Sequence, residues 1–119
     1  MKQLLVVFNT CGITGRENVI HYIESIESFL KQDFKSFDII ISSCMASEET
    51  KNCLSSIFAN QILYNFINEI LPVNVTFNHS VLETVKRKGN YDAYLYVDSG
   101  ATLDTNTHFL SDMYNLFTS

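Results

Sequence analysis

Asp98, Ser99 and Gly100 follow directly after the apolar run 94–97 and are the residues best placed to do chemistry. If that run is a strand, the Asp98 carboxylate leaves the sheet at the edge where ligands bind in α/β proteins. A carboxylate there can hold a hard divalent cation or a ribose hydroxyl, and a glycine lets the backbone approach a ligand closely. The same residue types also favour turns, so a simple turn is the alternative interpretation.

The ends of the other predicted strands supply further candidates by the same rule. These candidates are Phe8, Asn9 and Thr10 after the first strand, Ser42, Ser43 and Cys44 after the second, and Asn78 and His79 after the third.

Several common catalytic patterns are absent from the sequence. The loop 10–15 contains two glycines but matches neither GxGxxG nor GxxxxGK[ST], so we interpret the glycines as turn residues. The three histidines share no metal-ligand spacing, and neither an HExxH nor a GxSxG motif is present. The basic run 86–88 is explained by a helix C-terminus, where cations are favoured.

Charge and cysteine usage narrow the class of protein. The net charge of −5, from 8 basic and 13 acidic residues, argues against a nucleic-acid-binding protein. The three cysteines, Cys11, Cys44 and Cys53, form no CxxC pair, which favours a reducing, cytoplasmic location over a disulfide framework. The apolar run 4–8 is too short for a transmembrane segment or a signal peptide.

The elements that must position the candidates alternate along the chain. Apolar β-branched runs, or strict alternation, predict strands at 4–8, 37–41, 73–77 and 93–97. Amphipathic periodicity predicts helices at 18–31, 47–70 and 80–88, and a last helix that begins at Asp104 or Thr105 with apolar positions between 109 and 117.

Local signals mark the ends of these helices. Ser47 is a predicted N-cap with two glutamates behind it, and the long helix that follows is expected to break near Asn60 and to end at Pro72. Ser80, with a glutamate three residues later, reads as a capping box, and Gly89 as a stop.

This order predicts an α/β, Rossmann-like fold, with a mainly parallel sheet of about four strands and helices on both faces. The 119 residues match one domain, 1–119. The residues expected to form the core are Val6, Ile26, Ile40, Leu95 and Leu110.

Four segments, in this order, resemble family-2 glycosyltransferases with the GT-A fold. They are FNT at 8–10, SIESFLKQDF at 25–34, FDIIIS at 37–42 and YDAYLYVDSG at 91–100. The last looks like the strand that delivers the Asp-x-Asp motif of those enzymes. The resemblance covers nearly all of this chain, but only the N-terminal, nucleotide-sugar-binding half of such an enzyme.

The resemblance also implies site residues. The expected donor-binding residues are Phe8, Asn9, Thr10, Ser42, Ser43, Asp98, Ser99 and Gly100. Asp98 would be the first aspartate of a DXD-like motif and would hold Mn²⁺ or Mg²⁺. Two departures stand against this: residues 42–44 replace the usual aspartate pair, and Gly100 replaces the second metal-binding aspartate, for which Asp104 is a nearby substitute.

Two functions follow from the resemblance. The first is the donor-binding part of a glycosyltransferase, with a nucleotide-diphosphate sugar as partner and a docked acceptor half, or self-association, completing the protein. The second is a degenerate, non-catalytic GT-A-like module that binds a nucleotide or another protein, and the two departures favour it. A flavodoxin-like or other doubly wound binder is a third interpretation, because such proteins share the same architecture.

Overall fold

The computed structural model describes residues 3–11, 16–69, 71–98 and 108–118, and for 10–11, 16–19, 73, 98 and 117–118 it describes the backbone. Strands and helices alternate along the chain as predicted. They are β1 (Leu4–Cys11), α1 (Arg16–Leu30), β2 (Phe37–Cys44), α2 (Glu48–Phe58), β3 (Leu63–Ile67), α3 (Val73–Lys88), β4 (Ala93–Asp98) and α4 (Phe109–Thr118), with a 3-10 turn at Ala59–Gln61.

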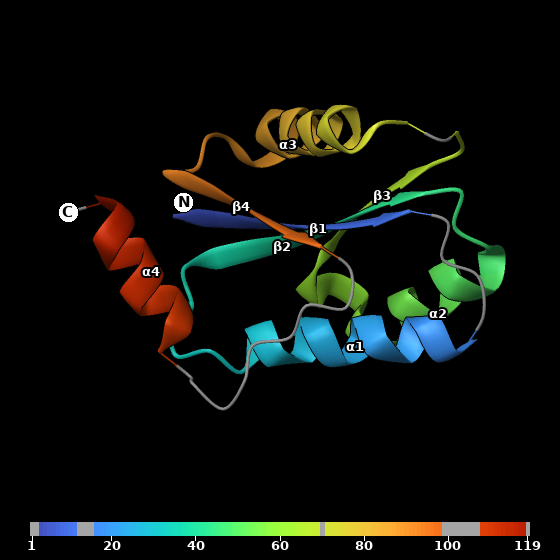
Figure 1. Ribbon diagram of the computed structural model, residues 1–119, viewed down its shortest axis with the longest axis horizontal. Coiled ribbons are helices and arrows are strands. Elements are labelled where there is room, and N and C mark those ends of the chain that lie inside the picture. Colours follow the sequence, from blue (N-terminus) through green and yellow to red (C-terminus); the bar gives the residue numbers. More distant parts are fainter. Residues whose placement is uncertain (1–2, 12–15, 70, 99–107, 119) are drawn as a thin grey trace.

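The four strands form one parallel sheet in the order β3-β2-β1-β4. Figure 1 shows α3 alone on one face, and α1 and α2 on the other. Helix α4 lies at the end of the sheet where the strands begin (Figure 1). The α/β, Rossmann-like fold class is therefore confirmed. The chain builds β1, β2 and β3 outward in one direction and then places β4 on the far side of β1, so the strand order reverses at β1.

Alternating side chains of the strands divide the core in two. Leu4, Val6 and Phe8 face the larger cluster, which contains residues of α1, α2 and α4, while Leu5 and Val7 face α3. Of the predicted core residues, Val6, Ile26, Ile40 and Leu110 are at most 1% exposed, and Leu95 is half-buried against the larger cluster. The two faces of the sheet are thus unequally packed.

The third strand was predicted in the wrong place. Residues 73–77 begin α3, and the third strand is Leu63–Ile67, inside the long helix that the periodicity predicted. Pro72 is the N-cap of α3 and does not close a preceding helix, because its fixed φ suits the start of a helix. Consequently Ser80 lies in the middle of α3 and does not cap it, and Asn78 follows no strand.

Other boundary signals are confirmed. Ser47 caps α2 by accepting the Thr50 backbone N–H at 3.2 Å. The expected break near Asn60 is the 3-10 turn, and α3 ends at its basic last turn with Gly89 at a φ of 88°. None of the helices in the described ranges is both long enough and apolar enough to cross a membrane.

Candidate functional site

The candidates from β1, β2 and β4 meet at one edge of the sheet. Asn9 is the Cα partner of Ser42 on one side and of Asp98 on the other. Thr10 is likewise the partner of Ser43. Strand β2 extends three residues beyond its predicted end, so Ser42, Ser43 and Cys44 belong to the strand itself. These residues lie at the carboxyl end of β1, the strand at which the strand order reverses. Ligands bind at this position in doubly wound folds.

Asn9 is the central polar residue of this edge. Only 6% of it is exposed, and its Nδ2 donates a long hydrogen bond of 3.5 Å to the Tyr96 hydroxyl. Its Oδ1 is buried and has no hydrogen-bond partner within the described part of the chain. Buried polar groups are nearly always paired, so the Oδ1 end of this amide is open to a partner beyond the described residues, such as a ligand.

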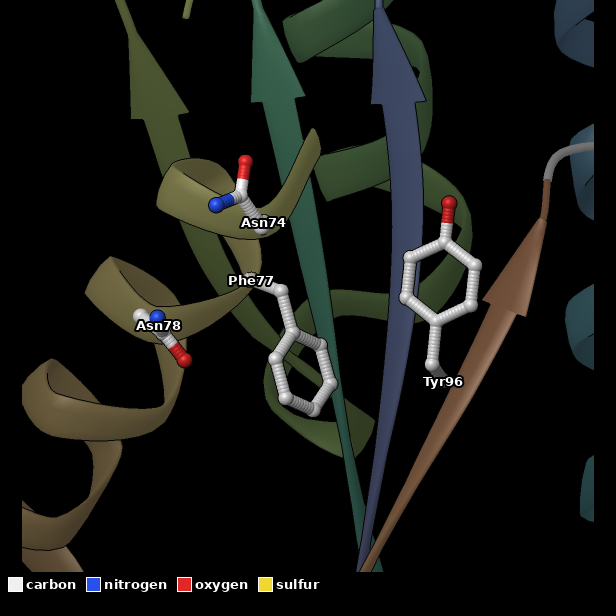
Figure 2. Close-up of a pocket in the computed structure, with 4 residues that line it drawn as sticks. All are labelled: Asn74, Phe77, Asn78 and Tyr96. Atoms are coloured by element: carbon white, nitrogen blue, oxygen red, sulfur yellow. The ribbon is translucent and has the colours of Figure 1, made fainter. Parts of the chain in front are cut away.

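A pocket of about 470 Å³ opens beside Asn9, on the α3 face of the sheet. It is lined by Asn74, Phe77 and Asn78 of α3 and by Tyr96 of β4. Figure 2 shows the Tyr96 hydroxyl pointing toward the carboxyl ends of the strands and the Phe77 ring lying beside the Tyr96 ring. The two rings pack edge to face, with centroids 5.8 Å apart and planes at 66°.

The chemistry of this pocket follows from its lining. Among the described residues its lining offers two aromatic rings and two carboxamides and no charged side chain. Aromatic faces stack on planar ligands, and a carboxamide both donates and accepts hydrogen bonds. The arrangement therefore suits a neutral, planar, polar ligand rather than a phosphate.

The sequence had indicated Asn78 but not the other three lining residues. Tyr96 lies inside a predicted strand, and the sequence pattern predicts a further strand at 73–77. The four-residue spacing of Asn74 and Asn78, next to Phe77, places these side chains together only if the segment is helical. The signal was present, but it depended on the correct assignment of α3.

Phe8 and Ser43 lie on the opposite side of the sheet from this pocket. Phe8 is fully buried and packs edge to face on Phe29, with ring centroids 4.9 Å apart. Ser43 is 1% exposed, and its hydroxyl has no partner among the described residues. Phe8 is therefore a core residue in this structure, and we leave it out of the site.

Ser42 lies on the pocket side, but its hydroxyl points into the protein. It is fully buried and donates to the carbonyl of Thr76 at 3.4 Å. The end of β2 thus presents no carboxylate to a ligand.

Asp98 ends β4, and its backbone lies beside that of Asn9. The other residues expected near it, Ser99, Gly100 and Asp104, lie outside the described residues. Within the described ranges, no group of three histidine, cysteine, aspartate or glutamate side chains is arranged to hold a metal ion. The metal site expected at Asp98 therefore stays a prediction.

The histidines do not converge on the pocket. His21 is exposed, as expected, and His108 pairs with Asp33 at the start of α4. His79 is exposed on α3, where its Nδ1 lies 3.0 Å from the amide nitrogen of Asn65.

One strongly shifted side chain lies far from this edge. Two effects hold the pKa of Tyr91 well above its usual value. The larger is burial, and the second is the hydrogen bond of 2.6 Å from its hydroxyl to Asp38. This pair joins the beginning of β4 to the beginning of β2, the opposite end of the sheet from Asn9. Shifted pKa values often mark active sites, but here the shift belongs to a structural contact between strands.

Comparison with known proteins identifies the fold. No family model matches the sequence, and no curated protein matches it significantly. Among solved structures, residues 1–349 of S. aureus TarS match with a TM-score of 0.63 and 19% identity, over 98% of this chain and 32% of that chain. The complex of the same protein with UDP matches with a TM-score of 0.63 and 16% identity, over the same shares. This chain thus spans about a third of the length of the structures it matches, and its fold fits a GT-A-like half.

Proposed function

We propose that this chain binds the nucleotide-diphosphate sugar donor of a glycosyltransferase-like protein. The observation that carries the proposal is the pocket beside Asn9. One end of this buried amide has no partner among the described residues, and the other is bonded to Tyr96, whose ring packs on Phe77 in the pocket. The proposal is supported by the position of the pocket at the reversal of strand order. The fold similarity to a protein solved in complex with UDP supports it further.

The nucleobase is the part of the donor that suits this pocket. Tyr96 and Phe77 offer aromatic surface for stacking, and stacking of one base on an aromatic side chain contributes about 1–3 kcal/mol. Asn9, Asn74 and Asn78 supply amides that can pair with the edge of a base. A charged diphosphate would gain little from these neutral side chains.

The diphosphate is assigned to the end of β4. Asp98 is the Cα partner of Asn9, so a donor whose base lies beside Asn9 can reach the end of β4 with its diphosphate. Asp98, with Asp104 as a possible second ligand, would hold Mn²⁺ or Mg²⁺ together with the phosphate oxygens, which such ions prefer. A bound divalent ion would neutralise the charge of a departing diphosphate.

A non-catalytic nucleotide-binding or protein-interaction module is the second candidate. Ser42 favours this second candidate. It stands where the resemblance leads one to expect an aspartate, and its hydroxyl is bonded to the Thr76 carbonyl. Nucleotide binding does not separate the two candidates, because both can bind a nucleotide. Transfer of a sugar to an acceptor would distinguish them, since only the glycosyltransferase-like protein would catalyse it. The reducing, cytoplasmic location and docking to an acceptor half, or self-association, stay predictions.

The test is a calorimetric titration of UDP and GDP, each with and without Mn²⁺. The matched variants are Tyr96→Ala and Tyr94→Ala, because both tyrosines lie on the same face of β4 but Tyr94 is not part of the pocket. We expect Tyr96→Ala to weaken nucleotide binding about tenfold or more, as the loss of one stacking contact implies. We expect Tyr94→Ala to leave it nearly unchanged. Absence of binding to the unaltered protein, or equal effects of the two variants, would refute the proposal.

A further inference from the structure

The face of helix α3 that packs on the sheet consists mainly of small hydroxyl side chains. Its fully buried residues are Thr76, Ser80 and Thr84, each at most 1% exposed and spaced four residues apart. Its larger side chains, Phe77 and Val81, are only partly buried against the smaller core cluster. Short hydroxyl side chains interlock poorly with a sheet, so apolar contacts alone define the position of this helix weakly.

Helix α1, on the other face, shows the contrast. It buries Tyr22, Ile26 and Phe29, which are at most 5% exposed and belong to the larger cluster. Large apolar side chains of this kind fix a helix on a sheet by shape. The position of α3 must therefore depend more on its hydrogen bonds.

Two sets of hydrogen bonds join α3 to the sheet. At β2, Ser42 donates to the Thr76 carbonyl, and Cys44 Sγ lies 3.6 Å from Thr76 Oγ1. Thr76 Oγ1 itself donates to the Pro72 carbonyl at 3.0 Å, which leaves the cysteine thiol as the donor of that contact. These bonds are long and involve weak donors.

The stronger bonds come from β3. The Asn65 amide nitrogen lies 2.9 Å from Ser80 Oγ and 3.0 Å from His79 Nδ1, so both of its N–H groups are directed at α3. His79 and Ser80 follow Asn78 immediately in the sequence. A displacement of this turn therefore moves the wall of the pocket directly.

We propose that Asn65 is a positioning residue for the pocket, since its two hydrogen bonds hold α3 where Asn74, Phe77 and Asn78 line the pocket together with Tyr96. The inference rests on the proposed function, because the position of α3 matters to a ligand only if the pocket binds one. Asn65 does not line the pocket and is assigned no contact with the ligand.

The test compares Asn65→Leu, which keeps the size of the side chain but removes both N–H groups, with Ile41→Val. Ile41 is buried in the opposite cluster, so its variant lowers stability without touching α3. The first measurement is the set of NMR contacts between the Phe77 and Tyr96 rings in the ligand-free proteins. The second is the affinity for UDP.

We expect Asn65→Leu to lose the contacts between the two rings while α3 stays helical, and to bind UDP about tenfold more weakly. Ile41→Val should keep both properties. Unchanged ring contacts in Asn65→Leu would overturn the inference. Lost ring contacts in a protein that never binds UDP would support the positioning role and remove the proposed function instead.

A milder variant guards against unfolding of Asn65→Leu. His79 is exposed, so His79→Ala removes one of the two acceptors at little cost to the fold. We expect a partial weakening of the same ring contacts. Identical contacts in His79→Ala and in the unaltered protein, with Asn65→Leu unfolded, would also count against the inference.

Discussion

The amide nitrogen of Asn9 and the hydroxyl of Tyr96, 3.5 Å apart, join two neighbouring strands at the edge of the sheet where ligands are expected. The bond is long, and the other end of the amide is unpartnered among the described residues. A polar group held in this way lowers the stability of the free protein and raises the strength of a ligand contact.

Replacing Asn9 by leucine should therefore separate stability from binding. An apolar side chain of similar size removes a buried, half-paired amide, so Asn9→Leu is expected to leave the free energy of unfolding unchanged or to increase it. Nucleotide affinity should fall about tenfold through the lost hydrogen bonds. Urea unfolding and calorimetric titration measure the two quantities. The exposed Asn115 provides the control Asn115→Leu, and a parallel loss of stability and affinity in Asn9→Leu would contradict the idea.

Asp98→Asn tests the metal. If Asp98 is the main protein ligand, Mn²⁺ should bind well only together with a nucleotide diphosphate, whose oxygens complete the coordination. The variant should lose most of this joint binding and keep its fold, because the residue stands at the end of β4. Titration of UDP at fixed Mn²⁺, with circular dichroism as the folding control, is the measurement. Equal affinities of the two proteins would remove Asp98 from the site.

Ile40→Ala tests the central position of β2. This strand lies between β1 and β3, and Ile40 is 1% exposed. Removing its side chain should lower the free energy of unfolding by about 2–5 kcal/mol. The exposed Ile57 provides a control, since Ile57→Ala should change it by less than about 0.5 kcal/mol. A loss below about 1 kcal/mol for Ile40→Ala would be too small for a central strand.

The contact between Asp33 and α4 predicts that the stability of the protein falls as the pH is lowered. The hydrogen bond from His108, and after it one from Ser111 at 3.2 Å, lowers the pKa of Asp33 below its usual 3.8. A depressed pKa in the folded state stabilises the protein above the unfolded value, and this contribution is lost as the pH falls through the folded value. Unfolding by urea below about pH 4 should therefore be less pH-dependent in Asp33→Asn than in the unaltered protein. The exposed Asp112 of α4 supplies the control Asp112→Asn, and the same pH dependence in all three proteins would sink the prediction.

The sequence was sufficient for the fold class because three of the four strands are continuous apolar runs. It failed between residues 60 and 80 for a physical reason. The buried face of α3 consists of Thr76, Ser80 and Thr84, which hydrophobic periodicity does not register, while Val73 and Phe77 alternate with polar residues as in a strand. Pro72 was the better signal, because proline favours the start of a helix.

The candidate site was predictable in one part. The strand-end rule identified Asn9, since it needs only the end of an apolar run. The pairing of Tyr96 with Phe77 was out of reach, because the two rings meet only when α3 packs on the face of the sheet over β1 and β2. Such a pairing is set by tertiary structure, and no local pattern of either segment encodes it.

The unpartnered end of the Asn9 amide has a practical consequence for identifying the ligand. A molecule that satisfies this group binds the folded state alone, so it raises the melting temperature of the protein whether or not any reaction follows. At a concentration one hundred times its dissociation constant, such a ligand adds about 2.7 kcal/mol to the stability. A panel of nucleosides, nucleotides and nucleotide sugars, screened by thermal shift, can therefore rank the bases without an acceptor. In Asn9→Leu the base-dependent differences should shrink, so the protein's own melting curve reports which base the amide recognises.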